Sequence, residues 1–261
     1  MQAKVIAISN QKGGVGKTTT SVNLAASLAA AESRVLLIDM DPQGNASSGL
    51  GIQKRDLERS VYHALIETEV LAHCKQATDF PYLDLIPANH ELIGAEIELV
   101  GERDRERRLE RALGSVREDY DFILIDCPPS LGLLTINALA AADTVLIPLQ
   151  CEYFAMEGLG DLLRTVQLIK GRLNKGLVPE GILLTMFDKR NRLSHVVAEE
   201  VRGLFGPQVF KTVIPRNVRL SESPSHGKPI LAYDIRSSGA QSYLKLAQEI
   251  LERNGRLESH A

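Results

Sequence analysis

A glycine-rich loop between an apolar run and a helical stretch constrains the fold of this 261-residue chain more than any other feature. The loop reads KGGVGKTT over residues 12–19, after the apolar run 5–9 and at the start of the alanine- and leucine-rich stretch 18–30. Glycines let successive backbone N–H groups point inward and keep Cβ atoms away from an anion. The start of the following helix presents its positive end to the same anion. The pattern therefore predicts a phosphate-binding loop.

Two lysines lie in or beside this loop, and they cannot share one role. Lys17 can reach the β- and γ-phosphates of a nucleotide, and the Thr18 hydroxyl is placed to bind Mg²⁺. The strict phosphate-loop pattern has glycine at position 11, where this chain has Gln11. Lys12 comes too early in the loop to act as Lys17 does. Its charge therefore either needs another anion or is solvated.

Carboxylates follow two other apolar runs. Asp126 ends the run FILID, where it can hold Mg²⁺ directly or through water, or can cap the next turn. Asp39 and Asp41 follow the run 35–38, at the strand ends where α/β sheets bind ligands. We expect Asp41 to orient the water that attacks the γ-phosphate. Asp39 is expected to be structural or an outer partner of Mg²⁺.

Apolar runs alternate with helical stretches along most of the chain. This alternation predicts an α/β fold with a mostly parallel, twisted sheet and helices on both faces. No linker rich in Pro, Ser or Gly divides the chain, so we expect one domain over residues 1–254 and a flexible tail over 255–261. The runs expected to be strands are 5–9, 35–38, 83–86, 122–125, 144–148, 182–185 and 209–214.

Two further segments are predicted to be helices. Residues 96–111 are dense in mixed charge, which is typical of a solvated helix with ion pairs between residues four apart. Residues 241–251 carry apolar side chains at the spacing of a helix docked on the core.

Composition limits the cellular setting and the partners. The net charge of −3 argues mildly against DNA, but residues 186–236 carry nine basic and five acidic side chains, a net charge of +4. No uninterrupted apolar run reaches about 18 residues, and the N-terminal run is too short for a signal peptide. Cys74, Cys127 and Cys151 lack metal-ligand spacing and are expected to be reduced thiols of a cytoplasmic protein.

These motifs together resemble the ParA/Soj family of chromosome-partitioning ATPases over about residues 4–253. The family's deviant Walker A loop corresponds to QKGGVGKTT, its switch segment to DMDPQGNASSGLG and its Walker B strand to ILIDCPPSLGLLTINAL. Two further blocks, PLQCEYFAMEGL at 148–159 and VIPRNVRLSESPSHGKPI at 213–230, are more specific. A generic P-loop enzyme has no reason to carry both.

The resemblance implies roles for individual residues. Lys12 matches the signature lysine that crosses to the nucleotide of the other subunit, and Gly13 matches a position close to that interface. Asp41 matches the residue needed for hydrolysis, and Pro215 and Asn217 fall where the family holds the adenine base. Motif and resemblance together predict that the residues binding ATP and Mg²⁺ are Lys12, Gly13, Gly14, Val15, Gly16, Lys17, Thr18, Thr19, Asp126, Pro215 and Asn217.

The resemblance also implies a function. ATP and Mg²⁺ tie two subunits into a homodimer that binds double-stranded DNA without reading its sequence, and hydrolysis stimulated by a ParB-type centromere-binding partner releases it. Arg190 and Arg219 fall at basic positions that the family uses for DNA, although a surface arginine can equally be only solvated. No aromatic platform or recognition helix is evident, so no base readout is expected. The expected location is the nucleoid.

Two other classes of ATPase or kinase stay open at this point. A MinD-like membrane-cycling ATPase would end in a basic amphipathic helix, whereas the tail LERNGRLESHA has few apolar residues and little positive charge. We therefore expect no membrane partner. A small-molecule kinase would need an acceptor pocket and a lid, and an ATPase that carries a metallocluster would need paired cysteines. The sequence shows neither.

Overall fold

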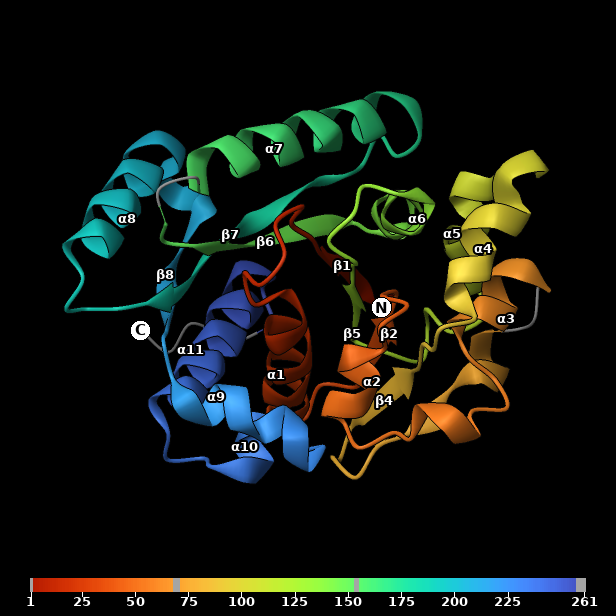
Figure 1. Cartoon of the computed structure of the whole chain (residues 1–261), viewed down its shortest axis with the longest axis horizontal. Helices are drawn as coiled ribbons and strands as arrows, with labels where there is room; N and C mark the ends of the chain where they lie inside the picture. The colour runs from red at the N-terminus through yellow and green to blue at the C-terminus, as the bar shows by residue number, and fades with distance from the viewer. Residues whose placement is uncertain (1, 68–70, 153–154, 257–261) are drawn as a thin grey trace.

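One twisted sheet crosses the middle of the molecule, with helices on both sides (Figure 1). The computed structural model describes residues 2–67, 71–152 and 155–256. In these residues the strand order is β3-β4-β2-β5-β1-β6-β7-β8, and every neighbouring pair except β3–β4 is parallel. The strands are β1 (Lys4–Ile8), β2 (Val35–Asp39), β3 (Gln76–Ala77), β4 (Leu83–Ile86), β5 (Phe122–Asp126), β6 (Thr144–Gln150), β7 (Val178–Phe187) and β8 (Val209–Pro215).

Alternating side chains of the buried strands feed two separate cores. Val5 and Ala7 of β1 belong to one core, and Ile6 and Ile8 belong to the other, as the two-residue period of a strand requires. The first core is covered by α3 (Val61–Ile66), α4 (Leu92–Glu98), α5 (Arg108–Leu113), α6 (Leu133–Ala141), α7 (Ala155–Arg172) and α8 (Arg192–Phe205). The second is covered by α1 (Lys17–Ala30), α2 (Asn45–Gly49), α9 (Val218–Glu222), α10 (Ile230–Tyr233) and α11 (Ser238–Arg253). Short 3₁₀ turns are η1 (Lys54–Asp56), η2 (Leu71–Cys74), η3 (Leu99–Gly101), η4 (Arg105–Arg107), η5 (Gly206–Gln208) and η6 (Ser223–His226).

The sheet order places a ligand-binding edge beside β1. β1 lies between β5 and β6, and the chain passes from β1 through α1 to β2, on the far side of β5. Ligands of open α/β sheets bind at such a switch point, outside the carboxyl ends of the strands. The register aligns Asp126 with both Ile8 and Asp39. Carboxylates from two strands therefore end level with the start of the glycine-rich loop.

The expectation of one solvated helix over residues 96–111 is wrong. α4 ends at Glu98, η3 follows, and a turn with Asp104 in the left-handed region (φ 55°) separates it from η4 and α5. The ion pairs seen here within the described residues join positions one, three, six and seven apart, rather than four. An example is Arg107 with Glu110, whose charged atoms are 2.6 Å apart.

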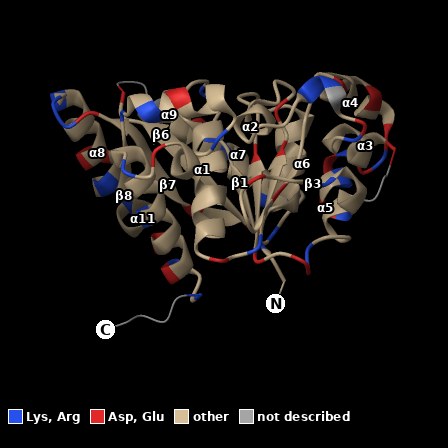
Figure 2. Ribbon diagram, turned by 90° about the horizontal axis from the view of Figure 1, so that it is seen from below, with Lys and Arg blue, Asp and Glu red and all other residues tan. Residues whose placement is uncertain are grey.

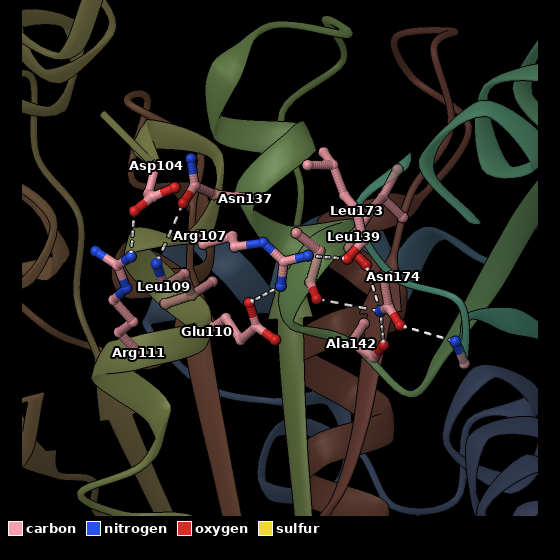
Figure 3. A network of polar contacts seen from close by, with 12 residues as sticks. Asp104, Arg107, Leu109, Glu110, Arg111, Asn137, Leu139, Ala142, Leu173 and Asn174 are labelled. Carbon is pink, nitrogen blue, oxygen red and sulfur yellow. Dashed lines mark hydrogen bonds and ion pairs between the residues drawn. The ribbon is translucent and has the colours of Figure 1, made fainter. Parts of the chain in front are cut away.

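Contacts with α6 and the α7–β7 loop explain why this segment is not one helix (Figure 3). Asn137 of α6 accepts a hydrogen bond from the N–H of Leu109 at 3.2 Å. Arg107 donates to the carbonyl of Leu173, and the neighbouring Asn174 donates to three carbonyls around the end of α6. Polar groups that a solvated helix would turn to water thus bind other elements.

The C-terminal helix α11 is longer at both ends than the predicted 241–251. It begins where the Ser237 hydroxyl oxygen accepts a hydrogen bond from the N–H of Ala240 at 3.2 Å. Tyr243 and Ile250 are fully buried in the second core. The domain boundary at 254 and the flexible tail over 255–261 stay predictions, because residues 257–261 lie outside the described part of the chain.

Glu249 of α11 completes the edge strand β8. Between the pairs Ile182–Val209 and Leu184–Val213, β8 carries two more residues than β7, so part of its backbone leaves the ladder. The N–H groups of Lys211 and Thr212 in this bulge donate to the two carboxylate oxygens of Glu249, at 2.9 and 3.0 Å. Burial alone would raise the pKa of Glu249, but these bonds and the nearby Arg253 outweigh it and hold the pKa below its ordinary value.

We predict that Glu249→Gln lowers the free energy of unfolding by about 1–3 kcal/mol, because one amide oxygen cannot serve both N–H donors. The pKa of Glu249 is lower in the folded chain, so its contribution is complete above the ordinary glutamate pKa and is lost as pH falls through the lowered value. In urea unfolding, the wild type should therefore have a higher free energy of unfolding than Glu249→Gln at neutral pH, and this difference should narrow below about pH 4. Glu252→Gln, exposed on the same helix, is the control, and an equal loss in both variants would contradict this role.

Candidate nucleotide-binding site

The loop between β1 and α1 has the backbone shape of a phosphate cradle. Gly14 and Gly16 adopt φ angles of 75° and 88°, which side chains with a Cβ rarely tolerate. A Cβ atom at Gly13 or Gly14 would meet no other atom within 4 Å, so this side of the loop is open. Val15 is buried instead. The N–H groups at the start of α1 are thus free to face an anion.

Two buried polar side chains hold this loop from outside. The Thr185 hydroxyl, near the end of β7, donates to the carbonyl of Val15 at 2.8 Å. Asn10 donates to the carbonyl of Pro148 at 2.7 Å and accepts from the N–H of Lys12 at 3.0 Å. Neither Thr185 nor Asn10 was predicted from the sequence. Their positions at or just after the carboxyl ends of strands were the available signal.

Lys17 lies under the loop and is only 7% exposed. Its ammonium donates to the carbonyl of Lys12 at 3.1 Å. Burial lowers the pKa of Lys17, and the nearby carboxylates of Asp126 and Asp41 act in the opposite direction. An anion placed in the loop would favour the charged ammonium in the same way.

Asp126 and Asp39 are both fully buried at the ends of adjacent strands. The Ser21 hydroxyl donates to Oδ1 of Asp126 at 2.7 Å, whereas Oδ2 has no partner among the described residues. Asp39 accepts the Ser47 N–H at 2.9 Å, the Ser47 hydroxyl at 2.7 Å and the Asp41 N–H at 3.1 Å. Burial raises the pKa of both carboxyls, and the charge of Asp39 raises that of Asp126 further.

The unpartnered oxygen of Asp126 fits a magnesium ion. A buried carboxylate oxygen is costly unless a donor or a cation meets it. Thr18 is close enough for its hydroxyl to lower the pKa of Asp126. Among the described residues no group of three or more His, Cys, Asp or Glu could hold a metal, so the phosphates of a nucleotide would have to complete the coordination.

Asp41 lies in the loop after β2 and is 8% exposed. Its carboxylate accepts the N–H of Gln43 at 2.9 Å, and its own N–H is held by Asp39. Gly44, at φ 61°, permits this turn because a Cβ there would lie 2.6 Å from the carbonyl oxygen of Ala88. In the described chain, Asp39 therefore makes the structural contacts that its sequence position suggested.

A cavity of about 480 Å³ lies between the start of α1 and α9. It brings Pro215 and Asn217 beside Gly16 and Thr19 of the loop, although about 200 residues separate them in the sequence. Met186, which has a positive φ of 49°, also lines this cavity and was not predicted from the sequence. The structure thus groups the residues predicted to hold the base with those predicted to hold the phosphates.

Lys12 does not point at its own loop. Its ammonium pairs with Glu152 at 2.7 Å, and both side chains are about half exposed, at 40% and 45%. Glu152 also accepts a hydrogen bond from Gln150. An exposed pair of this kind contributes at most about 1 kcal/mol, so Lys12 can change partner. The Lys12 ammonium was expected to be solvated or to bind an anion of another subunit. It is instead paired with Glu152 of its own subunit.

Arg190 and Arg219 lie outside the nucleotide cavity, near the β8 end of the sheet. Arg190 is 91% exposed in its side chain and pairs with Asp188 at 3.3 Å. Arg219 pairs with Glu222 at 2.9 Å and Asp234 at 3.5 Å. Arg219 would have to exchange two carboxylates for a phosphate, and Arg190 only one.

Proteins of known name that resemble this chain point to one family. A family model described as an AAA domain matches residues 3–178. The sporulation initiation inhibitor protein Soj of Bacillus subtilis is 61% identical over 247 residues, which is 95% of this chain and 98% of Soj. The chromosome partitioning protein ParA of Myxococcus xanthus is 59% identical over 251 residues, 96% of this chain and 89% of that protein. The chain belongs to the ParA/Soj family of chromosome-partitioning ATPases.

A solved relative of this ParA/Soj-family chain has nucleotide and metal bound. The cobyrinic acid a,c-diamide synthase from Mycobacterium smegmatis, with ADP and magnesium, superposes with a TM-score of 0.86 over 97% of this chain and 96% of its own. Its sequence is 37% identical, well below the identity with ParA and Soj, so its own activity does not decide the family. It is also solved with an ATP analogue and magnesium. No helix within the described ranges has the length and apolar character needed to span a bilayer.

We predict that Asp126→Asn stabilises the nucleotide-free protein at neutral pH by about 1–3 kcal/mol, because the neutral amide does not have to hold a proton in order to be buried beside Asp39, whereas the carboxyl does. The raised pKa of Asp126 means that wild-type stability falls as pH rises from 3.8, the ordinary value, towards the folded value. The variant should keep only the smaller fall that comes from Asp39, whose pKa burial raises to about 6, and it should gain no further stability when Mg²⁺ is added with ATP. Urea unfolding across pH measures both effects.

Asp119→Asn, on an exposed residue, is the control and should change stability by less than about 0.5 kcal/mol. A variant at Asp126 that is less stable than wild type at neutral pH, without nucleotide, would show that its carboxylate is satisfied and would contradict the magnesium assignment.

Proposed function

We propose that this protein partitions DNA as an ATP-dependent switch: ATP with Mg²⁺ joins two subunits, the dimer binds DNA without sequence preference, and hydrolysis releases it. The observation that carries the proposal is the phosphate cradle over Lys17 with the unpartnered oxygen of Asp126 beside it. Family membership supports the cellular role, because relatives at 59% and 52% identity are named chromosome partitioning proteins.

Some residues of the site are proposed to take part in hydrolysis, and the others bind the nucleotide. Lys17 neutralises the β- and γ-phosphates, and Asp41, held in place by Asp39, orients the attacking water. Thr18 and Asp126 would hold Mg²⁺, which when bound neutralises charge on the phosphates. The remaining residues of the cradle and the base cavity are Gly13, Gly14, Val15, Gly16, Thr19, Pro215 and Asn217.

Lys12 makes assembly depend on the nucleotide. In the single subunit its ammonium is held by Glu152 in a half-exposed ion pair of small net stability. The triphosphate of a second subunit carries more negative charge and binds an ammonium more strongly than one carboxylate does. Gly13, which has no side chain and is exposed beside Lys12, leaves room for the second subunit. The homodimer is therefore proposed to form when ATP replaces Glu152 as the partner of Lys12.

DNA is proposed to bind a basic groove at the β8 end of the sheet, where Figure 2 shows Lys and Arg around β8 and α8. The groove has a volume of about 860 Å³, and among the described residues that line it Asp188 is the one acidic residue. Of the two predicted arginines, Arg190 lines the groove, whereas Arg219 pairs with Glu222 and Asp234 and only its neighbour Val218 is in the lining. Its basic lining consists of Lys189, Arg190, Lys211, Arg216 and Lys245. Such a surface binds phosphates and reads no bases.

We predict that the protein binds duplex DNA of random sequence with ATP and much more weakly with ADP or without nucleotide. If each dimer contacts about four to six phosphates, the slope of log affinity against log salt is about −4 to −5. Asp41→Ala should bind ATP, fail to hydrolyse it and stay on DNA. Fluorescence anisotropy at two salt concentrations measures the binding, and nucleotide-independent binding would contradict the switch.

Lys245→Glu tests the groove itself, since this residue of α11 lies outside the basic segment recognised in the sequence. It should weaken ATP-dependent DNA binding and reduce the salt slope by about 1 for each phosphate that the groove no longer neutralises. Lys175→Glu makes the same charge change at an exposed position between α7 and β7. Equal effects of the two substitutions would mean that net charge alone matters, and that the groove is wrongly assigned.

A further inference from the structure

An exposed apolar stripe on α4 and η3 takes no part in the nucleotide site or the basic groove. Ile93, Ile97 and Val100 are 50%, 72% and 63% exposed. Their spacing of four and three residues places them on one side of the helix. The other side is packed into the core, with Leu92 and Ala95 fully buried. We call these three side chains the α4 stripe. They do not contribute to the core of the subunit, and an exposed apolar surface of this kind marks a site for a partner.

The charge around the α4 stripe specifies what that partner carries. Residues 91–102 contain four glutamates and no lysine or arginine. Glu102 pairs with Arg108 at 3.0 Å, whereas Glu91, Glu96 and Glu98 have no cationic partner within the described chain. Glu91 and Glu98 accept hydrogen bonds from neutral donors, and Arg105 donates to the carbonyl of Val100 at one end of the stripe. Negative charge is therefore in excess beside the stripe, which fits a helix with apolar anchors on one face and basic side chains beside them.

Glu96 connects this surface to the segment that follows Asp126. Its carboxylate lies against Gly132, where a Cβ atom would collide with it. Gly132 is the N-cap of α6, and a negative charge at a helix N-terminus is favourable. Gly132 lies six residues after Asp126, so α4 contacts the loop that begins after this proposed magnesium ligand. Figure 2 shows α4 and α2 along the same upper edge of the molecule, with α4 at its right-hand end.

We propose that the α4 stripe is the docking surface for a basic amphipathic helix of the ParB-type partner, and that docking acts through Glu96 and Gly132 on the loop after Asp126. The inference rests on the proposed function, which supplies a partner that stimulates hydrolysis. The structure adds where that partner binds and how its binding reaches the active site.

The test is a titration of ATPase activity with the cognate ParB-type protein. Ile97→Lys puts a cation in the centre of the stripe, and it should raise the partner concentration for half-maximal stimulation at least about 10-fold. Basal hydrolysis and ATP-dependent DNA binding should stay at the wild-type level. Ile93→Lys is a second variant with the same expected result. Leu168→Lys is the matched control on α7, 61% exposed, and should leave the titration unchanged.

Glu96→Gln separates docking from transmission. It should leave the half-maximal partner concentration within about 3-fold of wild type and lower the maximal stimulation, because the contact with Gly132 loses its charge.

Each other outcome overturns a different statement. Unchanged titrations of both lysine variants overturn the docking surface alone. Loss of the ATP-dependent dimer in Ile97→Lys would show that a second copy of the chain covers the stripe, which also overturns the proposal. A wild-type protein that the ParB-type protein does not stimulate overturns the partner in the proposed function, and this inference with it.

Discussion

The rest of the structure depends on a set of buried charged groups at the carboxyl edge of the sheet. The chain itself does not supply all the partners that these groups need. Asp126 and Asp39 are fully buried side by side, and Lys17 is buried next to them. Burial raises the pKa of the carboxyls and lowers that of the lysine, so each charge is more costly here than in water. A phosphate group and a divalent cation are the complement that this set lacks. The glycines of the loop and the open oxygen of Asp126 leave room for them.

The same argument extends from the site to the assembly. Lys12 stands at the mouth of the loop with a carboxylate partner, Glu152, that holds it weakly. Lys17 already lies under the loop of its own subunit, where it would meet the phosphates of that subunit's nucleotide. An anion that draws Lys12 away from Glu152 would therefore come from outside the subunit. In the proposed function, charge links nucleotide binding to dimerisation, and dimerisation doubles the basic groove. Glu96, on the helix that carries the α4 stripe, contacts Gly132 in the loop after Asp126.

Much of this fold follows from local sequence. The parts that could not be predicted in this way are determined by contacts between residues far apart in the chain. The seven predicted strands are present because each is mainly apolar and largely buried, although Asp84 interrupts β4 and Lys211 and Thr212 interrupt β8. The two-residue β3 has no such signal. Residues 96–111 were wrongly predicted as one helix because Asn137 and Leu173 bind their polar groups. The phosphate loop and Asp126 could be found from motifs. The Lys12–Glu152 pair could not, because its members are 140 residues apart.

The molar mass of the Asp41→Ala protein in solution, measured by light scattering with saturating Mg²⁺ and ATP, tests the central claim most directly. That claim is that two subunits join because each Lys12 exchanges Glu152 for the triphosphate held by the other subunit. The account predicts twice the subunit mass with ATP, the subunit mass with ADP, and the subunit mass with ATP when Lys12→Ala is added while ATP still binds. A protein that stays monomeric with ATP, or one that dimerises equally well without Lys12, would contradict it.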